Sequence, residues 1–472
     1  MKLNKRIITV MVTVLALFLV LVGYLTYFTV FKAPEIVKSS YNPRIWEKEK
    51  KILRGTIYDR NGNVLAESKT QEDNQTRVYP YGPLYAHTIG YNNRTYGKTN
   101  IESSFNDYLT KPQSVIEVLK NENAQKNSLP QGANISLTLD HSMTSLAAEL
   151  LGNDPGSVVA INPLTGEVYC LYSSPTFDPN EEVLAKNWDE LLERSDSPFF
   201  ARATQGLYAP GSTFKVISAT AAIEEGLEGF TTDDKGNTIV GGKKFRNASE
   251  KAYGQINIAD AIRVSSNVFF TEISQEIGKS ALKEKAEDFC IMRKIPFDIP
   301  TNASDEAFDE IDKAELGSVA IGQGKLRVSP FNMALVACSI ANNGVMMRPY
   351  MVEKAFYEDG EAIYNSSIEI LSRATDTMTA QKIKEYMIGC VNSGTGTAAR
   401  VSGMTVAGKT GTAENEKEGK THAWFIGFAP AENPQIAICV MKEYSGRGGG
   451  SVCAPIASKL IQNALNNGLI TN

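Results

Sequence analysis

This chain of 472 residues has few of the usual marks of metal and nucleic-acid sites: it is poor in histidines, cysteine pairs and blocks of positive charge. Only three histidines are present, and none belongs to a cluster with the spacing of metal ligands. The six cysteines lie far apart without a Cys-x-x-Cys pair, so no disulfide pairing can be assigned. The net charge is −5 and the isoelectric point is about 5.6, which argues against nucleic acid as a partner. We therefore predict no metal and no cofactor.

Long apolar runs are also rare, and the clearest one lies at the N-terminus. Residues 7–31 carry no charged side chain, and a helix of this length spans a hydrocarbon core of about 30 Å. Basic residues precede the run, so the positive-inside rule places residues 1–6 in the cytoplasm. The alternative is a cleaved signal peptide, but the run is too long and residues 29–32 offer no small-residue cleavage site. We predict an uncleaved single-pass anchor in the cell membrane, with the rest of the chain extracytoplasmic.

The most informative segment, residues 208–215, reads Tyr-Ala-Pro-Gly-Ser-Thr-Phe-Lys. Ser212 and Lys215 lie three residues apart, so on a helix the amine can reach the hydroxyl. A serine hydroxyl needs an adjacent base, and a lysine serves as one when burial or a neighbouring cation keeps it neutral. The uncharged residues 216–223 predict a buried helix, whose N-terminus favours an oxyanion. The segment predicts acyl transfer through a serine ester, with an N-cap serine as the alternative.

A second copy of this spacing, at Ser280 and Lys283, lies in a charged run. We interpret Ser280 as the N-cap of a surface helix and not as a nucleophile.

Two further polar motifs follow in the chain. Ser265 and Asn267 form a Ser-x-Asn motif with apolar residues on both sides, which indicates polar groups in a buried wall; the alternative is a pair of loop residues that cap a helix. Residues 408–414 read Gly-Lys-Thr-Gly-Thr-Ala-Glu and predict a strand, along whose edge a substrate backbone could lie. The alternative is an ordinary edge strand on which Lys409 discourages aggregation.

Ser-x-x-Lys, Ser-x-Asn and Lys-Thr-Gly, in this order, form the motif set of penicillin-binding proteins and serine β-lactamases. The chain resembles a class B penicillin-binding protein, a peptidoglycan D,D-transpeptidase of the penicillin-binding protein A/2-like type. The resemblance covers nearly the whole length, because residues 54–62 resemble the first N-terminal motif of the family. Residues 321–330 resemble its Gly-Gln-Gly segment, and residues 390–398 its glycine-rich approach to Lys-Thr-Gly.

The resemblance implies catalytic roles for five side chains. Ser212 would attack the carbonyl of a D-Ala-D-Ala stem peptide, and Lys215 would take its proton. Ser265 would relay a proton between Lys215, Lys409 and the leaving amine. Asn267 would hold Lys215 and the substrate amide, and Lys409 would supply positive charge.

Substrate-binding roles are implied in the same way. The backbone N–H groups of Ser212 and Thr412 would form the oxyanion hole. The hydroxyls of Thr410 and Thr412 would bind the terminal carboxylate, and Gly411 would allow close approach of the ligand. β-Lactams would imitate the donor peptide and trap Ser212 as an ester.

The order of the expected elements, two strands first, helices between and three strands last, predicts an α+β fold. The resemblance makes this the penicillin-binding and serine β-lactamase-like fold, a five-stranded antiparallel sheet packed against helices. The expected strands are 156–163, 166–172, 404–413, 423–429 and 435–441, and the expected helices are 143–151, 213–225, 331–342 and 451–472. The expected regions are a cytoplasmic tail (1–6), an anchor (7–31), an N-terminal pedestal, or dimerisation-like, domain (32–139) and a transpeptidase domain (140–472).

In the pedestal, Asn61-Gly62 predicts a hairpin turn. We interpret Arg54, Asp59 and Arg60 as residues that form salt bridges within this hairpin, without a catalytic role. Asn100 takes the place of a glycine of the family, which puts the local turn there in question.

Other functions share these motifs. A D,D-carboxypeptidase would use the same residues with water as acceptor, and a catalytically silent scaffold or a β-lactam sensor would keep the fold. A β-lactamase would need a deacylating base, and no Glu-x-x-Leu-Asn element follows Ser265. The family implies peptidoglycan stem peptides, β-lactams, the membrane and a multi-span glycosyltransferase of the shape, elongation, division and sporulation (SEDS) type as partners. The sequence leaves open the acceptor amine and the choice between division, elongation and sporulation.

Overall fold

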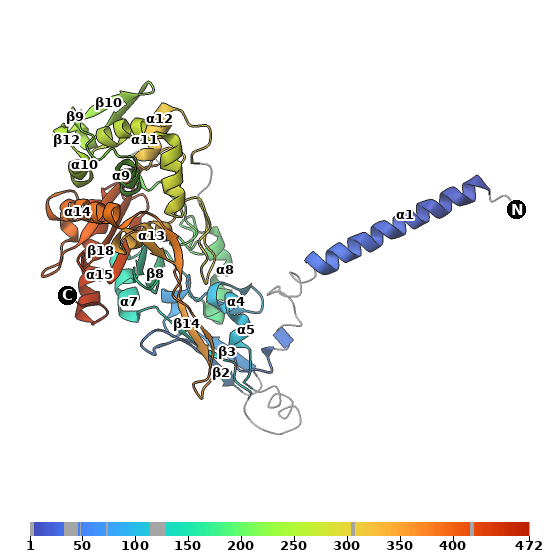
Figure 1. Cartoon of the computed structure of the whole chain (residues 1–472). Coiled ribbons are helices and arrows are strands. Elements are labelled where there is room, and N and C mark those ends of the chain that lie inside the picture. Colours follow the sequence, from blue (N-terminus) through green and yellow to red (C-terminus); the bar gives the residue numbers. More distant parts are fainter. Residues whose placement is uncertain are drawn as a thin grey trace.

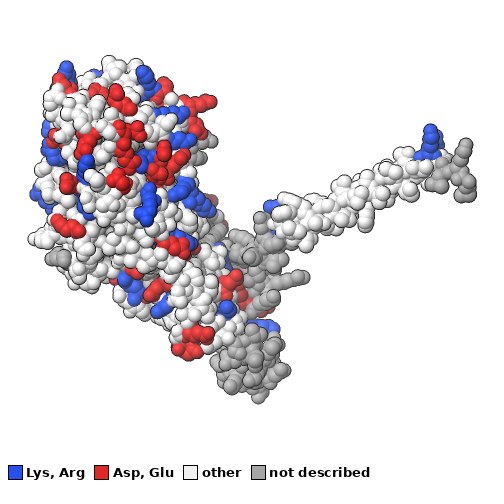
Figure 2. Space-filling view, viewed as in Figure 1, with Lys and Arg blue, Asp and Glu red and all other residues white. Residues whose placement is uncertain are grey.

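An isolated apolar helix begins the structure, which is a computed structural model. The model describes residues 4–32, 46–47, 49–71, 74–113, 129–303, 307–415 and 420–471. Helix α1 (Lys5–Tyr27) continues into a π-helical turn (Phe28–Lys32) and stands apart from the folded body (Figure 1). Its surface is uncharged along its length, with basic residues at its N-terminal end (Figure 2). By length and composition it can cross a membrane, as the sequence predicts.

The central sheet of the folded body has five strands. They are β7 (Gly156–Ile161), β8 (Val168–Ser174), β17 (Ala407–Glu414), β18 (Thr421–Ala429) and β19 (Ile436–Lys442). Their order is β17-β18-β19-β7-β8, and every neighbouring pair is antiparallel. The predicted α+β fold is confirmed, and β17, which carries the Lys-Thr-Gly segment, lies at an edge of the sheet.

Helices cover both faces of this sheet. Helices α7 (His141–Leu151) and α15 (Gly449–Asn466) pack on one face, and α13 (Pro330–Ala341) packs on the other. Alternate residues of β19 therefore belong to different cores: Ile438 lies in the core with α15, and Cys439 lies in the core with α13. Because both faces are buried, the strand has a continuous apolar sequence.

Most of the other helices, together with several short strands and 3-10 turns, lie outside the central sheet. The helices are α5 (Asn106–Leu109), α8 (Glu181–Glu193), α9 (Lys215–Glu224), α10 (Ile258–Val264), α11 (Asn267–Asp288), α12 (Lys313–Ala320) and α14 (Thr377–Ser393). The short strands are β4 (Asn92–Asn93), β5 (Gly97–Lys98), β9 (Thr232–Asp234), β10 (Asn237–Val240), β11 (Lys243–Arg246), β12 (Gly254–Ile256), β13 (Val345–Met347) and β16 (Ile370–Arg373). The 3-10 turns are Gly82–Tyr85, Gly211–Thr213, Ala248–Glu250 and Thr397–Ala399.

A second sheet joins strands of the predicted pedestal to a hairpin from residues 352–365, in the order β15-β14-β6-β1-β2-β3. Its strands are β1 (Ile57–Tyr58), β2 (Val64–Gln71), β3 (Asn74–Val78), β6 (Asn134–Leu137), β14 (Val352–Phe356) and β15 (Ala362–Asn365). The antiparallel pairing of β1 with β2 confirms the hairpin predicted at Asn61-Gly62. The hairpin β14–β15 comes from the C-terminal half of the chain and completes the sheet, an arrangement that the sequence did not indicate.

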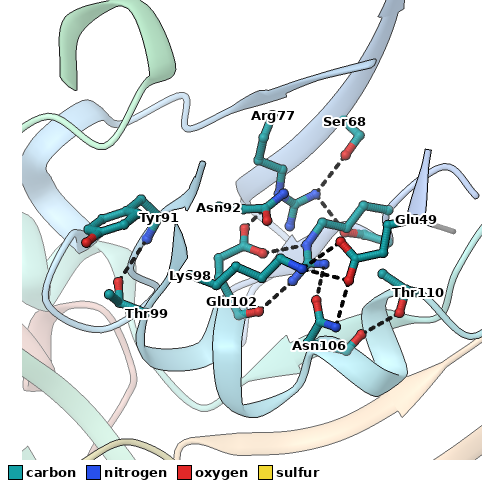
Figure 3. A network of polar contacts seen from close by, with 12 residues as sticks. Glu49, Ser68, Arg77, Tyr91, Asn92, Lys98, Thr99, Glu102, Asn106 and Thr110 are labelled. Atoms are coloured by element: carbon teal, nitrogen blue, oxygen red, sulfur yellow. Dashed lines mark hydrogen bonds and ion pairs between the residues drawn. The ribbon is translucent and has the colours of Figure 1, made fainter. Parts of the chain in front are cut away.

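A buried polar network joins this sheet to helix α4 (Asn100–Ser104) (Figure 3). The carboxylate of Glu102 accepts hydrogen bonds from Nε of Arg54 at 2.6 Å and from Nε of Arg77 at 2.7 Å. Nearby, Lys98 donates to the carboxylate of Glu49 at 2.6 Å. Burial alone would raise the pKa of Glu102, but the charges of Arg54 and Arg77 outweigh it and lower the pKa to about 2.

The salt-bridge interpretation of the β1–β2 hairpin is wrong. Arg54 pairs with Glu102, and Arg60 lies 3.7 Å from the carboxylate of Glu167 in the hairpin β7–β8. The carboxylate of Asp59 instead accepts the backbone N–H of Asn61 at 2.9 Å and stabilises the turn. A local sequence pattern could not reveal Glu102 and Glu167 as the partners of the two arginines, because both lie far along the chain.

Asn100, in place of the glycine of the family, adopts a left-handed backbone conformation. Its φ is +48°, in the left-handed region that asparagine tolerates better than most residues. Its side-chain amide donates to the carbonyl of His87 at 2.9 Å, which fixes the turn further.

Candidate active site

The turn that carries Ser212 is pressed against the edge strand β17. It consists of the 3-10 turn Gly211–Thr213, after which α9 begins at Lys215. Gly211 has a φ of +54°, and a Cβ atom there would lie 2.5 Å from the carbonyl oxygen of Thr412. Only glycine allows this approach, which brings Ser212 and Thr412 to the same cleft.

Lys215 is completely buried at the start of α9. Its amine donates to the side-chain oxygen of Asn267 at 2.7 Å and to the carbonyl of Ser265 at 2.9 Å, and lies 3.4 Å from the Ser265 hydroxyl. Burial, and then the charge of Lys409, holds the pKa of Lys215 well below its usual value. The amine is therefore suited to accept a proton near neutral pH.

Ser265 links the two lysines from a strained position between α10 and α11. Its φ of +61° and ψ of 44° are left-handed, which is costly for a serine and typical of functional sites. The Ser265 hydroxyl accepts a hydrogen bond from Lys409 at 2.9 Å. Burial lowers the pKa of Lys409 to about 8. Within the described residues, neither Lys215 nor Lys409 forms an ion pair, so their charges are held by neutral oxygens.

The edge strand β17 supplies the predicted substrate-binding residues. Thr412 is exposed to the cleft, whereas the hydroxyl of Thr410 lies 2.6 Å from that of Thr395. A Cβ atom on Gly411 would lie 2.9 Å from the carbonyl oxygen of Pro210. The packing of the protein itself thus requires glycine at 411, and close approach of a ligand there remains a prediction.

Most of these groups border one cleft of about 1150 Å³, large enough for a peptide, and the buried amines of Lys215 and Lys409 contact its lining residues Asn267 and Ser265. Its lining includes the following predicted site residues: Ser212, Ser265, Asn267, Thr410, Gly411 and Thr412. Strand β11 and Asn247 also line the cleft. The structure thus brings the three motifs together. Ser280, by contrast, is exposed on α11 and does not line this cleft.

Sequence reasoning missed three polar residues of this region. Thr395 lies in the glycine-rich segment 390–398, so its position beside Lys-Thr-Gly could have been suspected. Asp234 and Asn247 are both buried and hydrogen-bonded to each other behind the Ser-x-Asn motif. No sequence signal singles them out, because they lie in short irregular strands and turns.

Comparisons with known proteins agree with this geometry. Residues 156–462 match the penicillin binding protein transpeptidase domain, and residues 54–135 match the penicillin binding protein A dimerisation domain. Peptidoglycan D,D-transpeptidase PbpA of Mycolicibacterium smegmatis is 30% identical over 495 residues, which cover 98% of this chain and 100% of the relative.

Solved structures extend the comparison to three dimensions. Penicillin-binding protein A of M. tuberculosis, in its ceftriaxone acyl-enzyme complex, is 29% identical with a TM-score of 0.82, over 88% of this chain and 99% of that one. The D,D-transpeptidase domain of a peptidoglycan glycosyltransferase from Eggerthella lenta is 31% identical with a TM-score of 0.81, over 89% and 100%. The fold is that of D,D-transpeptidases and of a penicillin-binding protein that forms an acyl-enzyme with a β-lactam. The chain belongs to the penicillin-binding protein transpeptidases, of class B, and the resemblance seen in its sequence is confirmed.

Proposed function

We propose that the chain is a membrane-anchored, serine-type peptidoglycan D,D-transpeptidase that β-lactams inhibit by acylating Ser212. The observation that carries the proposal is the meeting of Ser212 and the edge strand β17 at one cleft, with two buried lysines hydrogen-bonded to its lining residues Asn267 and Ser265. The relative from M. smegmatis is named a peptidoglycan D,D-transpeptidase, and the M. tuberculosis neighbour is an acyl-enzyme with a β-lactam. Both support the same reaction here.

In the proposed first half-reaction, Oγ of Ser212 bonds to the carbonyl carbon of the penultimate D-Ala while Lys215 takes the hydroxyl proton. The oxyanion lies between the backbone N–H groups of Ser212 and Thr412. The C–N bond to the terminal D-Ala then breaks, and Ser265 delivers a proton from the lysine pair to the leaving amine. The product is an ester on Ser212.

In the second half-reaction, the amine of a neighbouring stem peptide attacks this ester. The amine loses a proton, the bond between the carbonyl carbon and Oγ breaks, and Ser212 recovers its proton. Asn267 orients Lys215 and the donor amide, while Lys409 and the hydroxyls of Thr410 and Thr412 attract the terminal carboxylate. Because β17 is an edge strand, the donor backbone can pair along it.

The proposed organisation follows the predicted boundaries: tail (1–6), anchor (7–31), pedestal (32–139) and transpeptidase domain (140–472). The N-terminus lies in the cytoplasm and the cleft outside, where peptidoglycan is assembled. A SEDS-type glycosyltransferase that makes the glycan strands is the proposed membrane partner, with α1 and the pedestal as its contact surfaces.

The test uses the full chain in detergent micelles, fluorescent penicillin and intact-protein mass spectrometry. One adduct should form on the parent and on Ser280→Ala, the matched control in the second Ser-x-x-Lys, and none on Ser212→Ala. Absence of an adduct on the folded parent would contradict the proposal and favour a silent scaffold.

A second assay separates the proposed transpeptidase from the alternative carboxypeptidase. The chain is given a stem peptide ending in D-Ala-D-Ala, together with a D-amino acid as acceptor. Release of D-Ala with incorporation of the added amine supports transpeptidation, and release with water alone as acceptor identifies a carboxypeptidase.

A further inference from the structure

A buried carboxylate that the proposed mechanism does not use lies behind the Ser-x-Asn motif. Asp234, at the end of β9, is completely buried, yet it forms no ion pair within the described part of the chain. Three groups donate to it: the amide of Asn247 at 2.8 Å, the hydroxyl of Ser266 at 2.6 Å and the backbone N–H of Gly236 at 2.8 Å. Each group is a donor, as an ionised carboxylate requires.

The chain of contacts runs from Asp234 to the first turn of α11. Because both oxygens of Asp234 hold the amide of Asn247, the amide oxygen of Asn247 points the other way. It accepts the backbone N–H of Asn267 at 2.8 Å and that of Val268 at 3.2 Å. Ser266, which donates to Asp234, accepts the N–H of Phe269 at 3.0 Å. Asp234 therefore orients both groups that cap this helix.

The same helix end carries the amide that contacts the proposed base. Asn267 accepts from Lys215 at 2.7 Å through its side-chain oxygen, and its amide nitrogen donates to the carbonyl of Arg246 at 2.8 Å. The position of this oxygen thus depends on the backbone of residue 267, which Asn247 holds.

We propose that Asp234 is a positioning residue for acyl transfer, whose carboxylate sets Asn267 against Lys215 through Asn247 and supplies buried negative charge near Lys215. This inference rests on the proposed function. The charges of Asp234, Lys215 and Lys409 sum to zero when Asp234 is ionised and only one of the two lysines is protonated. This balance favours one proton shared between the two lysines.

The electrostatic part has a defined sign. The charge of Asp234 raises the pKa of Lys215, against burial and the charge of Lys409, which lower it. Removing the negative charge must therefore lower the pKa of Lys215 further. Other ionisable groups on the adjoining elements are Tyr253, Arg263 paired with Asp260, and Arg246 paired with Glu250.

The experiment measures the rate of acylation by excess fluorescent penicillin between pH 5 and 10, with the full chain in detergent. In Asp234→Asn we expect the plateau rate to fall about tenfold because Asn267 loses its support. We expect the acid limb of the rate–pH profile, where the rate falls as Lys215 is protonated, to move to lower pH by about one unit. Asp233→Asn is the matched control: its side chain is half exposed and pairs with Lys235, so both quantities should stay at the parent values.

The charge swap Asp234→Asn with Asn247→Asp returns a carboxylate to the pair and should move the limb back toward the parent. A folded Asp234→Asn whose acid limb stays at the parent pH would overturn the proposal.

If Asp234→Asn fails to fold, Ser266→Ala provides the test. This variant removes the hydrogen bond from Ser266 to Asp234 and leaves the charge of Asp234 in place. In Ser266→Ala the plateau acylation rate should fall, while the acid limb of the rate–pH profile should stay at the parent pH. A plateau rate equal to that of the parent would overturn the proposal. If the parent itself does not label, the proposed function fails and not this inference alone.

Discussion

The pedestal and the active site both bury charged side chains, but they differ in whether those side chains form ion pairs. In the pedestal, Arg54 and Arg77 each lie within 2.7 Å of the carboxylate of Glu102, and Lys98 lies 2.6 Å from that of Glu49. Next to the cleft, Lys215 and Lys409 are just as buried, yet among the residues that the structure describes their amines contact only neutral oxygens.

This difference bears on which charges can change near neutral pH, although burial also lowers the pKa of the paired Lys98. Pairing with two arginines overcomes burial and fixes Glu102 as an anion, with a pKa of about 2. Without a carboxylate partner, burial lowers the pKa of Lys409 to about 8 and that of Lys215 well below its usual value. Paired charge thus stabilises one geometry, whereas unpaired buried charge provides groups that can gain and lose protons.

The largest expected effect comes from replacing one buried lysine in each region. Lys215→Gln should slow penicillin acylation about a thousandfold, because it removes the proposed base. Lys98→Gln should leave acylation per folded molecule unchanged. It should lower the free energy of unfolding by about 3 kcal/mol, because Glu49 loses its partner. Stopped-flow labelling and urea denaturation measure the two quantities. Equal acylation rates in the two variants would remove the distinction between the regions.

Glu102→Ala should destabilise the protein by about 3–5 kcal/mol, because two buried guanidinium groups lose their counter-charge. The matched control is Glu67→Ala, whose partly exposed pair with Lys69 should contribute less than about 1 kcal/mol. Both values come from denaturant unfolding of the full chain in detergent. If the two variants unfold alike, the pedestal network does not stabilise the fold.

Two glycines with positive φ distinguish the cost of backbone strain alone from the cost of a steric clash. A Cβ atom at Gly211 would meet Thr412, so Gly211→Ala should displace β17 and slow acylation about a hundredfold. Gly62, at φ +84°, has no atom within 4 Å of such a Cβ, so Gly62→Ala should cost only about 1 kcal/mol of stability. A parent-like labelling rate in a folded Gly211→Ala would show that the spacing of this turn is not needed.

The last expected effect is a pH dependence of pedestal stability. The pKa of Glu102 is lowered on folding from 4.5 to about 2. Its contribution is therefore complete above pH 4.5 and is lost as the pH falls toward 2. Thermal unfolding of the parent and of Glu102→Gln at several pH values measures it. Their difference in stability should shrink over this range, and a constant difference would contradict the assignment.

Much of this arrangement could be predicted from the sequence, because it lies in short segments with local order. The hairpin β7–β8, the three C-terminal strands and the helix after Ser212 follow from apolar patterns and turn residues. The boundaries differ by a few residues, and the closing helix ends at Asn466. The order of the three motifs identified the family before any geometry was known.

The remaining features depend on contacts between distant parts of the chain. Strand β14 pairs with β6 across more than two hundred residues, as Ala355 with Ile135, and no local pattern shows that pairing. The partner of Arg54 is Glu102, not the nearby Asp59. Asp234 and Asn247 are ordinary polar residues of loops in the sequence, and only folding brings them behind Asn267. Tertiary structure alone determines which buried charges find partners.

The most direct test of the central claim is the pH dependence of acylation of the parent by fluorescent penicillin in a single turnover. If the unpaired Lys215 is the base, the rate should fall on the acid side with the loss of one group. The midpoint should lie well below 10.5, the usual lysine value. A rate that keeps rising up to pH 10 would show that Lys215 stays protonated at neutral pH, and it would contradict the account.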